Sequence, residues 1–129
     1  MSAFVVSFTV ALLAVAGLVI DGGYTLATRR QAFNEANAAA RAGAQAIDET
    51  SLRADGTVRV QPGRARTLAL DHLAAAGLDG TVEVLGDTVT VHVTTTQDLA
   101  LLGIIGVGPF TIEAEGSARA VAGVRAAGD

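Results

Sequence analysis

Side chains that could carry out acid–base or metal chemistry are scarce in this sequence, which has two histidines and no cysteine. His72 directly follows Asp71 within an expected helix, and adjacent residues of a helix do not face each other. His92 alternates with Thr90 and Thr94 on the polar face of an expected strand. Neither histidine has the spacing of a metal site. We therefore expect both to be solvated surface residues, and we predict no metal ion.

Hydroxyl groups and glycine runs offer no better candidate for catalysis. The serines, none of which lies in the context of a nucleophile elbow, are Ser2, Ser7, Ser51 and Ser117. The runs Asp21–Gly23 and Gly103–Gly108 lack the strand and helix that flank a phosphate-binding loop. We interpret the first run as a helix bend and the second as an apolar loop. Thr94–Thr96 is interpreted as exposed strand, with glycosylation of a secreted form as the alternative. We predict that the protein is not an enzyme and has no cofactor.

Composition and charge narrow the class of protein further. The 129 residues allow one domain beyond an N-terminal segment, and a net charge of −4 gives no basic footprint for nucleic acid. Hydrophobic residues make up 50% of the chain but aromatic ones only 4%, so the apolar content is mostly Ala, Val, Leu and Gly. Small side chains let backbones approach closely. Helices in close contact fit this composition better than a thick globular core.

The run Met1–Ile20 carries no charged side chain. As a helix it would span roughly 30 Å, the thickness of the hydrocarbon core of a bilayer. We therefore predict a membrane segment that ends at Asp21. A cleavable secretory signal would have a basic start and a shorter apolar run, whereas the first basic residue here is Arg29. Two interpretations stay open: Met1 follows a basic leader that has been removed, or Met1 is the initiator and Arg29 and Arg30 face the cytoplasm.

The helix is expected to continue beyond this apolar run. Tyr24–Ile47 contains no Pro and is rich in Ala, which favours helix. A narrow apolar stripe recurs every seven residues, at Leu26, Phe33, Ala40 and Ile47. Gly22 and Gly23 are predicted to bend the helix, because each Gly costs about 1 kcal/mol relative to Ala in a helix interior. The whole helix, of about 45 residues, would be roughly 70 Å long.

The rest of the chain, residues 49–129, is predicted to form a small α+β head domain, and residues 1–48 the helix. We expect a loop over Glu49–Gly56, a short strand over Thr57–Val60, and one short helix over Arg64–Ala76. Gly77 is placed to end that helix.

The head is expected to contain a small antiparallel sheet. The alternating runs Thr81–Leu85 and Thr88–Thr96 meet at Gly86-Asp87 and predict a hairpin. Phe110–Val121 alternates as a third main strand, and Gly116 marks a bulge or bend in it. The apolar, Gly-rich segment Leu99–Phe110 is too short to span a bilayer. It is expected to pack against the sheet, the long helix or a neighbouring molecule.

The N-terminal run is FVVSFTVALLAVAGLVIDGGYTLATRRQAFNEANAAARAGAQAI. It consists of an uncharged helix, then Gly-x-x-x-Asp-Gly-Gly over Gly17–Gly23, then an Arg-bearing, Ala-rich helix that ends near Ala-Gly-Ala. In these features the chain resembles the TadE/TadG-like proteins of bacterial Tad/Flp pilus systems. The C-terminal run VTVHVTTTQDLALLGIIGVGPFTIEAEGSARA is similar to actinobacterial members. The likeness therefore covers most of the chain.

The resemblance implies a type IV pilin-like life history. A prepilin peptidase removes a short leader, the apolar helix leaves the inner (cytoplasmic) membrane with the pilus assembly machinery, and it packs into a filament core that the head domain coats. The chain would then be a structural subunit of an extracellular pilus, a helical homopolymer with a role in cell adhesion. The alternatives are a membrane-anchored minor pilin, another envelope component of pilus assembly or secretion, and an anchored periplasmic binding domain.

Polymerisation is expected to use the first half of the helix. The side chains expected to line the filament core are Phe4, Phe8, Leu12, Leu13, Val15 and Leu18. Many type IV pilins carry Glu at mature position five, where it can neutralise a neighbour's N-terminal ammonium, whereas this chain has Val5. A buried, unpaired ammonium is costly. We hypothesise that Asp21 of another subunit, or solvent at a loose core, meets that charge.

Overall fold

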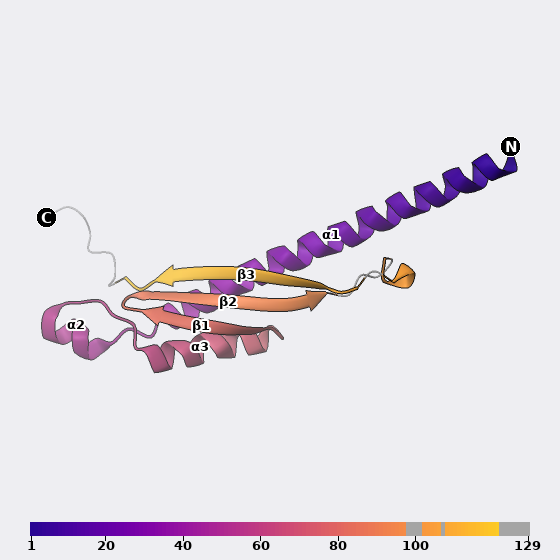
Figure 1. The fold of residues 1–129 in the computed structure, drawn as a ribbon. Helices are drawn as coiled ribbons and strands as arrows, with labels where there is room; N and C mark the ends of the chain where they lie inside the picture. Colours follow the sequence, from indigo (N-terminus) through magenta and orange to yellow (C-terminus); the bar gives the residue numbers. More distant parts are fainter. Residues whose placement is uncertain (98–101, 107, 122–129) are drawn as a thin grey trace, which may run out of the picture.

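The computed structural model describes residues 1–97, 102–106 and 108–121 (Figure 1). The helices are α1 (Ser2–Ala44), α2 (Glu49–Asp55) and α3 (Pro62–Ala75). The strands are β1 (Asp79–Leu85), β2 (Thr88–Gln97) and β3 (Phe110–Arg119), with a short 3₁₀ helix, η1 (Leu102–Ile105), before β3. A long apolar helix joined to a small antiparallel sheet is the α+β architecture that the sequence predicts.

The first helix, α1, is a single α-helix of 43 residues. Its composition favours this length, because Ala and Leu are strong helix formers and no Pro interrupts them. The few hydroxyls of the apolar run are also compatible with helix. The Thr9 side chain, for example, donates a hydrogen bond to the Val5 carbonyl at 2.8 Å. The division of the chain at residues 48 and 49 stays a prediction.

The loop predicted over Glu49–Gly56 is wrong, because these residues form α2. Asp48 caps the helix: its carboxylate accepts hydrogen bonds from the backbone N–H groups of Thr50 and Ser51 at 3.0 and 3.4 Å. Gly56 then ends the helix in the left-handed conformation, with φ at +71°. The described chain therefore has two short α-helices beyond α1, where the sequence predicted one.

The strand predicted over Thr57–Val60 is also wrong. Val60 forms only an isolated β-bridge with Ile47, just after the end of α1. Its N–H group donates to the Gly86 carbonyl at 2.9 Å, and the Gln61 N–H donates to the Ala46 carbonyl at 2.8 Å. These single bonds tie the connection to the body of the head without extending the sheet.

The helix predicted over Arg64–Ala76 is confirmed as α3, with its start two residues earlier. Pro62 opens it, at a position where a missing N–H costs nothing. Gly77 ends it as predicted, with φ at +72°. The Gly77 and Leu78 N–H groups donate to the carbonyls of Ala74 and Leu73 at 3.0 and 2.9 Å, which satisfies the last turn.

The strands form one antiparallel sheet in the order β1-β2-β3, which confirms the predicted hairpin and third strand. Gly86 and Asp87 connect the hairpin. Gly86 has φ at +61°, and no described residue other than Gly has a positive φ. A positive φ at the first turn position alone is the pattern of a type II′ turn, whose twist matches that of the flanking strands.

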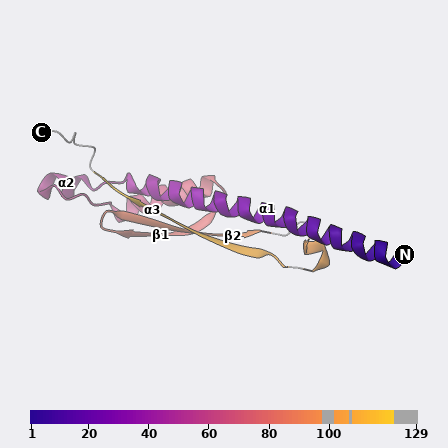
Figure 2. The ribbon, with the colours of Figure 1, turned by 90° about the horizontal axis from the view of Figure 1, so that it is seen from above.

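The helices α1 and α3 cover the same face of the sheet: α1 lies against β2 and β3, and α3 lies against β1 and α1 (Figure 2). The largest fully buried side chains are Leu73, Val89, Val91 and Val93. Most of the other core residues are alanines, including Ala32, Ala36, Ala39 and Ala40 of α1. The core is thus a thin layer in which small helix side chains let α1 lie close to the sheet.

Of the two alternatives predicted at Gly116, the bulge is wrong, because β3 pairs with β2 without interruption from Thr88↔Arg119 to Gln97↔Phe110. The bend stays a prediction. Gly116 serves a different purpose. A Cβ atom there would lie 2.3 Å from both the Ala36 carbonyl carbon and the Asn37 nitrogen of α1. Only Gly therefore permits the observed approach of helix and strand.

Candidate assembly surface on the N-terminal helix

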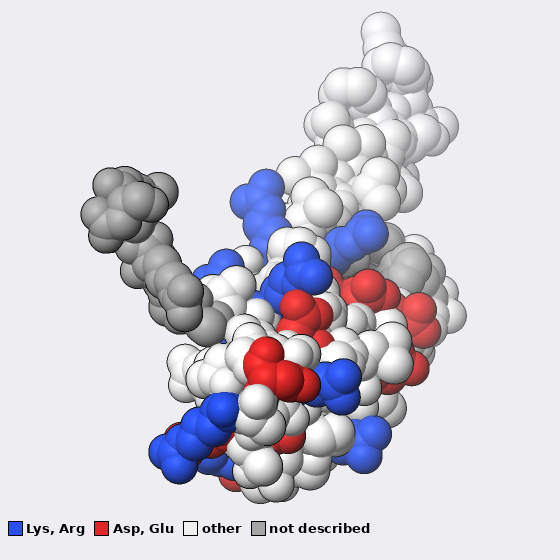
Figure 3. Space-filling model, turned by 90° about the vertical axis from the view of Figure 1, so that its left-hand side faces the viewer, with Lys and Arg blue, Asp and Glu red and all other residues white. Residues whose placement is uncertain are grey.

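The N-terminal half of α1 projects beyond the sheet and exposes almost every large apolar side chain that it carries. The exposed fractions of the six side chains expected in a filament core are 74% for Phe4, 57% for Phe8, 55% for Leu12, 68% for Leu13, 58% for Val15 and 62% for Leu18. Figure 3 shows the charged side chains gathered on the head, whereas the projecting rod carries none. By length and composition alone, α1 could cross a membrane.

Five of these six side chains share one face of α1. At about 100° per residue, Phe4, Phe8, Leu12, Val15 and Leu18 fall within an arc of about 120°. The rings of Phe4 and Phe8 stack, with their centroids 6.2 Å apart. Leu13 lies on the opposite side, where it lines a cavity together with Gly17 and Ile105 of η1. The single chain therefore leaves the broad face of these five side chains exposed, and η1 approaches the opposite side of the helix, where Leu13 is also exposed.

The two features predicted between the halves of α1 lie in different environments. The helix runs on through Gly22 and Gly23, and nothing lies within 4 Å of where a Cβ atom would be at either residue. The bend predicted at this pair stays a prediction. Asp21, in contrast, is only 2% exposed and already interacts within its own chain. Asp21 would have to leave this environment to meet the N-terminus of another subunit, and that pairing also stays a prediction.

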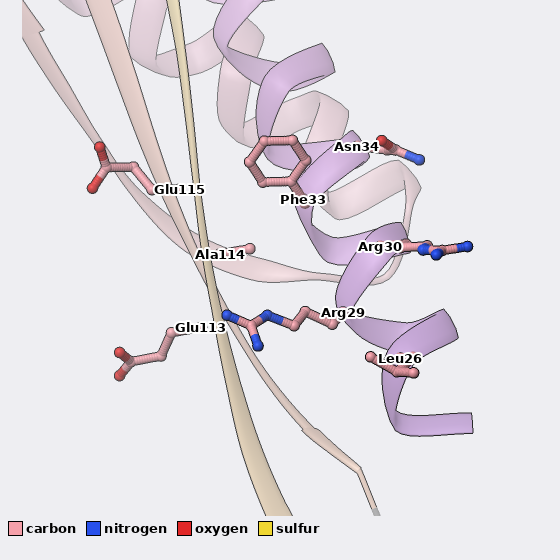
Figure 4. A pocket seen from close by; sticks show the side chains of 8 residues that line it. All are labelled: Leu26, Arg29, Arg30, Phe33, Asn34, Glu113, Ala114 and Glu115. Atoms are coloured by element: carbon pink, nitrogen blue, oxygen red, sulfur yellow. The ribbon is translucent and has the colours of Figure 1, made fainter. Parts of the chain in front are cut away.

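A groove of about 530 Å³ lies between the edge strand β3 and the part of α1 that comes after Gly23 (Figure 4). Leu26 and Phe33 give it an apolar floor, and they are 60% and 53% exposed. Arg29 extends toward β3, whereas the side chains of Glu113 and Glu115 point away from α1 (Figure 4). No ion pair joins these groups among the described residues. The groove is an open apolar surface with charged margins.

The two histidines are paired with glutamates. His72 Nε2 lies 2.9 Å from a carboxylate oxygen of Glu35 and so links α3 to α1, a contact between distant segments that sequence reasoning missed. Its side chain is 36% exposed, which makes it less solvated than expected. His92 lies on the outer face of the sheet, as predicted, with Nδ1 3.4 Å from Glu115 and Nε2 3.9 Å from Glu83. Among the described residues no cluster of three such side chains could hold a metal ion.

The carboxylates with shifted pKa values lie at turns and helix ends of the head. The hydrogen bond from the Ser51 hydroxyl lowers the pKa of Asp48, and the backbone N–H of Thr57 lowers the pKa of Asp55. The Arg119 guanidinium, with Nε 2.6 Å from the Asp87 carboxylate, lowers the pKa of Asp87. All three shifts favour the charged form of a group that stabilises the fold. None of these groups lies on the projecting half of α1.

Comparison with known families places a pilus signature on this helix. Residues 1–46 match a family model described as "Putative Flp pilus-assembly TadE/G-like". The matched residues include all of α1, so the family signature and the candidate assembly surface coincide. No curated protein and no solved structure matches the chain.

Proposed function

We propose that this chain, whose N-terminal 46 residues are TadE/G-like, is a structural subunit of a Tad/Flp-type pilus and polymerises through the N-terminal half of α1. One observation carries the proposal: the hydrophobic core is built from the C-terminal half of α1 together with the head, while the first half of α1 leaves a broad face of large apolar side chains without cover. Such a face needs either lipid or copies of itself. A pilus-assembly family, typically of structural proteins rather than enzymes, offers both in turn.

The energy of helix burial supports polymerisation without any covalent chemistry. Burying this half of α1 among neighbours would remove roughly 1,500 Å² of apolar surface from water. At 25 cal/mol per Å² this is worth roughly 40 kcal/mol before the entropy of association is subtracted. Before assembly the same surface would lie in the cytoplasmic membrane. The proposed partners are therefore the membrane, other copies of the chain, the prepilin peptidase and the assembly machinery, and the destination is a cell-surface filament.

The test is a charge placed at the centre of the exposed face. Phe8→Asp should abolish filaments in electron micrographs of material sheared from cells, because a carboxylate cannot be buried among apolar helices without a partner. Leu85→Asp is the matched control, since Leu85 is equally apolar and 77% exposed but lies at the hairpin of the head. Membrane flotation of both variants separates loss of assembly from loss of insertion. Normal filaments from Phe8→Asp would refute the proposed core.

A second function is favoured by the family description, which refers to pilus assembly rather than to a pilin. In this alternative the chain stays in the membrane as a minor subunit or assembly component. The two functions differ in stoichiometry. Quantitative mass spectrometry of purified filaments should find this chain as the main component if it is the structural subunit, and at trace level or not at all if it is the assembly component.

The proposed meeting of Asp21 with a neighbour's N-terminal charge has a separate test. Asp21→Asn keeps the size of the side chain and removes its charge. If the pairing contributes to the filament core, the variant should yield fewer or shorter filaments at equal expression. An Asp21→Asn variant that assembles normally would rule the pairing out and leave the rest of the proposal intact.

A further inference from the structure

The short helix η1 (Leu102–Ile105) lies beside the apolar half of α1, beyond the end of the sheet (Figures 1 and 2). Ile105 lines a cavity of about 520 Å³ whose other walls come from α1, among them Leu13, Gly17 and Ile20. All of these α1 residues belong to the uncharged run that would cross a membrane. The short helix η1 is thus a second apolar element that lies at the level of the predicted membrane segment of α1.

The tip of this element is both apolar and uncovered. Ile104 is 80% exposed and Ile105 is 75% exposed, although each is a large aliphatic side chain. From Leu102 to Gly106 the sequence is Leu-Gly-Ile-Ile-Gly, without any charged or hydrogen-bonding side chain. Two adjacent exposed isoleucines on a short 3₁₀ helix are unfavourable in water, so their surroundings in the working protein should be apolar.

We propose that Ile104 and Ile105 insert into the phospholipid bilayer beside α1, in the leaflet on the side of the head, while the protein is membrane-bound. The occupant of this surface is lipid because the surface is continuous with the candidate membrane span of α1 and lies at the same level along it. The inference rests on the membrane residence of α1 in the proposed function, and it does not depend on polymerisation.

The position of η1 along α1 fits shallow insertion. At 1.5 Å per residue, Gly17 and Leu13 lie about 5 and 10 Å below Ile20, which is the depth range of interfacial apolar groups. Arg29 lies about 14 Å on the other side of Ile20, at the level of lipid headgroups and water. The backbone of the turn is also partly satisfied, because the Gly106 N–H donates to the Gly103 carbonyl at 3.2 Å.

The absence of cysteine makes the depth of each position measurable in the full chain. Single-cysteine variants Ile105→Cys, Leu13→Cys and Leu85→Cys would each carry the fluorophore NBD, in vesicles of phosphatidylcholine and phosphatidylglycerol with nitroxide-labelled lipids. Leu85 is the matched control, because it is 77% exposed against 75% for Ile105 but lies at the far end of the sheet. Circular dichroism checks that each labelled chain is folded.

We expect lipid nitroxides to quench the probe at residue 105 severalfold more than the probe at residue 85, and to quench residue 13 as well. Quenching at residue 105 as low as at residue 85, with residue 13 strongly quenched, would overturn this inference alone. Failure to quench residue 13 would overturn it together with the membrane part of the proposed function. A third outcome is a blue-shifted emission at residue 105 that lipid nitroxides do not quench and that disappears when the protein is diluted in lipid. That result would assign the surface to a second copy of the chain and would also overturn the inference.

Discussion

At the scale of single residues, the fold depends on places where a small or charged group is required by one particular neighbour. Gly116 is needed because the backbone of α1 occupies the space of its Cβ atom. Asp48 is needed because two backbone N–H groups at the start of α2 lack partners within the helix. Sequence periodicity alone does not distinguish such residues from ordinary loop glycines and surface acids.

Gly116→Ala should destabilise the head by about 1–3 kcal/mol, because the added methyl group would force α1 away from β3. Urea denaturation followed by circular dichroism in detergent measures this directly. Gly63→Ala is the control, since Gly63 lies in α3 with nothing within 4 Å of where a Cβ would be. The control should be neutral or slightly stabilising. If both variants unfold at the wild-type urea concentration, the close contact at Gly116 does not hold the helix in place.

Asp48 should make the stability of the head fall in acid. Its pKa is lowered from an ordinary 3.8 by the hydrogen bonds that the carboxylate accepts from Ser51 and Thr50. The folded state therefore binds the proton less readily than the unfolded state, so this contribution to stability is present above the unfolded pKa and is lost as the pH falls through the folded one.

We expect the melting temperature of Asp48→Asn to lie below that of the wild type at neutral pH and to approach it below pH 3.8. Asn can still cap a helix, so the variant removes the titration rather than the cap. Asp71→Asn is the control, because Asp71 makes no side-chain hydrogen bond among the described residues. A constant difference between Asp48→Asn and wild type across the acid range would contradict the assignment.

At the scale of elements, the C-terminal half of α1 functions as part of the head core. The buried residues of this half are Ala32, Ala36, Ala39, Ala40, Gly43 and Ala44. The small size of these side chains lets the helix lie close to both the sheet and α3. The same helix therefore serves two environments, with small buried residues in the head and large exposed ones beyond it.

Ala39→Leu should cost about 1–3 kcal/mol in unfolding free energy, because Ala39 is fully buried and extra methyl groups would overpack the layer. Ala27→Leu is the matched control, since Ala27 is an exposed residue of the same helix and Leu is a good helix former. Urea titrations of the two variants give the comparison. If the two variants were equally stable, α1 could move away from the sheet without any loss of unfolding free energy, which would contradict the prediction.

Sequence reasoning predicted the elements that follow a strong pattern and missed those set by local hydrogen bonds. The uncharged run correctly predicted the long helix, and the alternating valines of β2 correctly predicted the sheet. The loop at Glu49–Gly56 was wrong because α2 is short, so Asp48 and Gly56 carry a signal that hydrophobic periodicity does not contain. The pairing of Glu35 with His72 and the position of η1 beside α1 depend on contacts between distant segments, which a single sequence does not specify.

At the scale of the whole molecule, the head should fold without the projecting half of α1. The hydrophobic core begins at Ala32, and the six predicted filament residues contribute nothing to it. A chain that lacks Ser2–Ile20 should be a soluble monomer by size-exclusion chromatography, with cooperative unfolding near the wild-type melting temperature. It should also fail to float with vesicles. A truncated chain that aggregates or melts without cooperativity would show that the two halves are not independent.

The continuity of α1 has a mechanical consequence. The head joins the projecting half through unbroken helix, so a pull on the proposed filament would act along the helix axis. Such a pull loads the contacts of α1 with β2, β3 and α3 in shear, where they must give way together rather than one after another. Resistance to force is governed by the rate of unfolding, and this geometry should make unfolding slow. The close approach of α1 at Gly116 would then act as a mechanical anchor for the head.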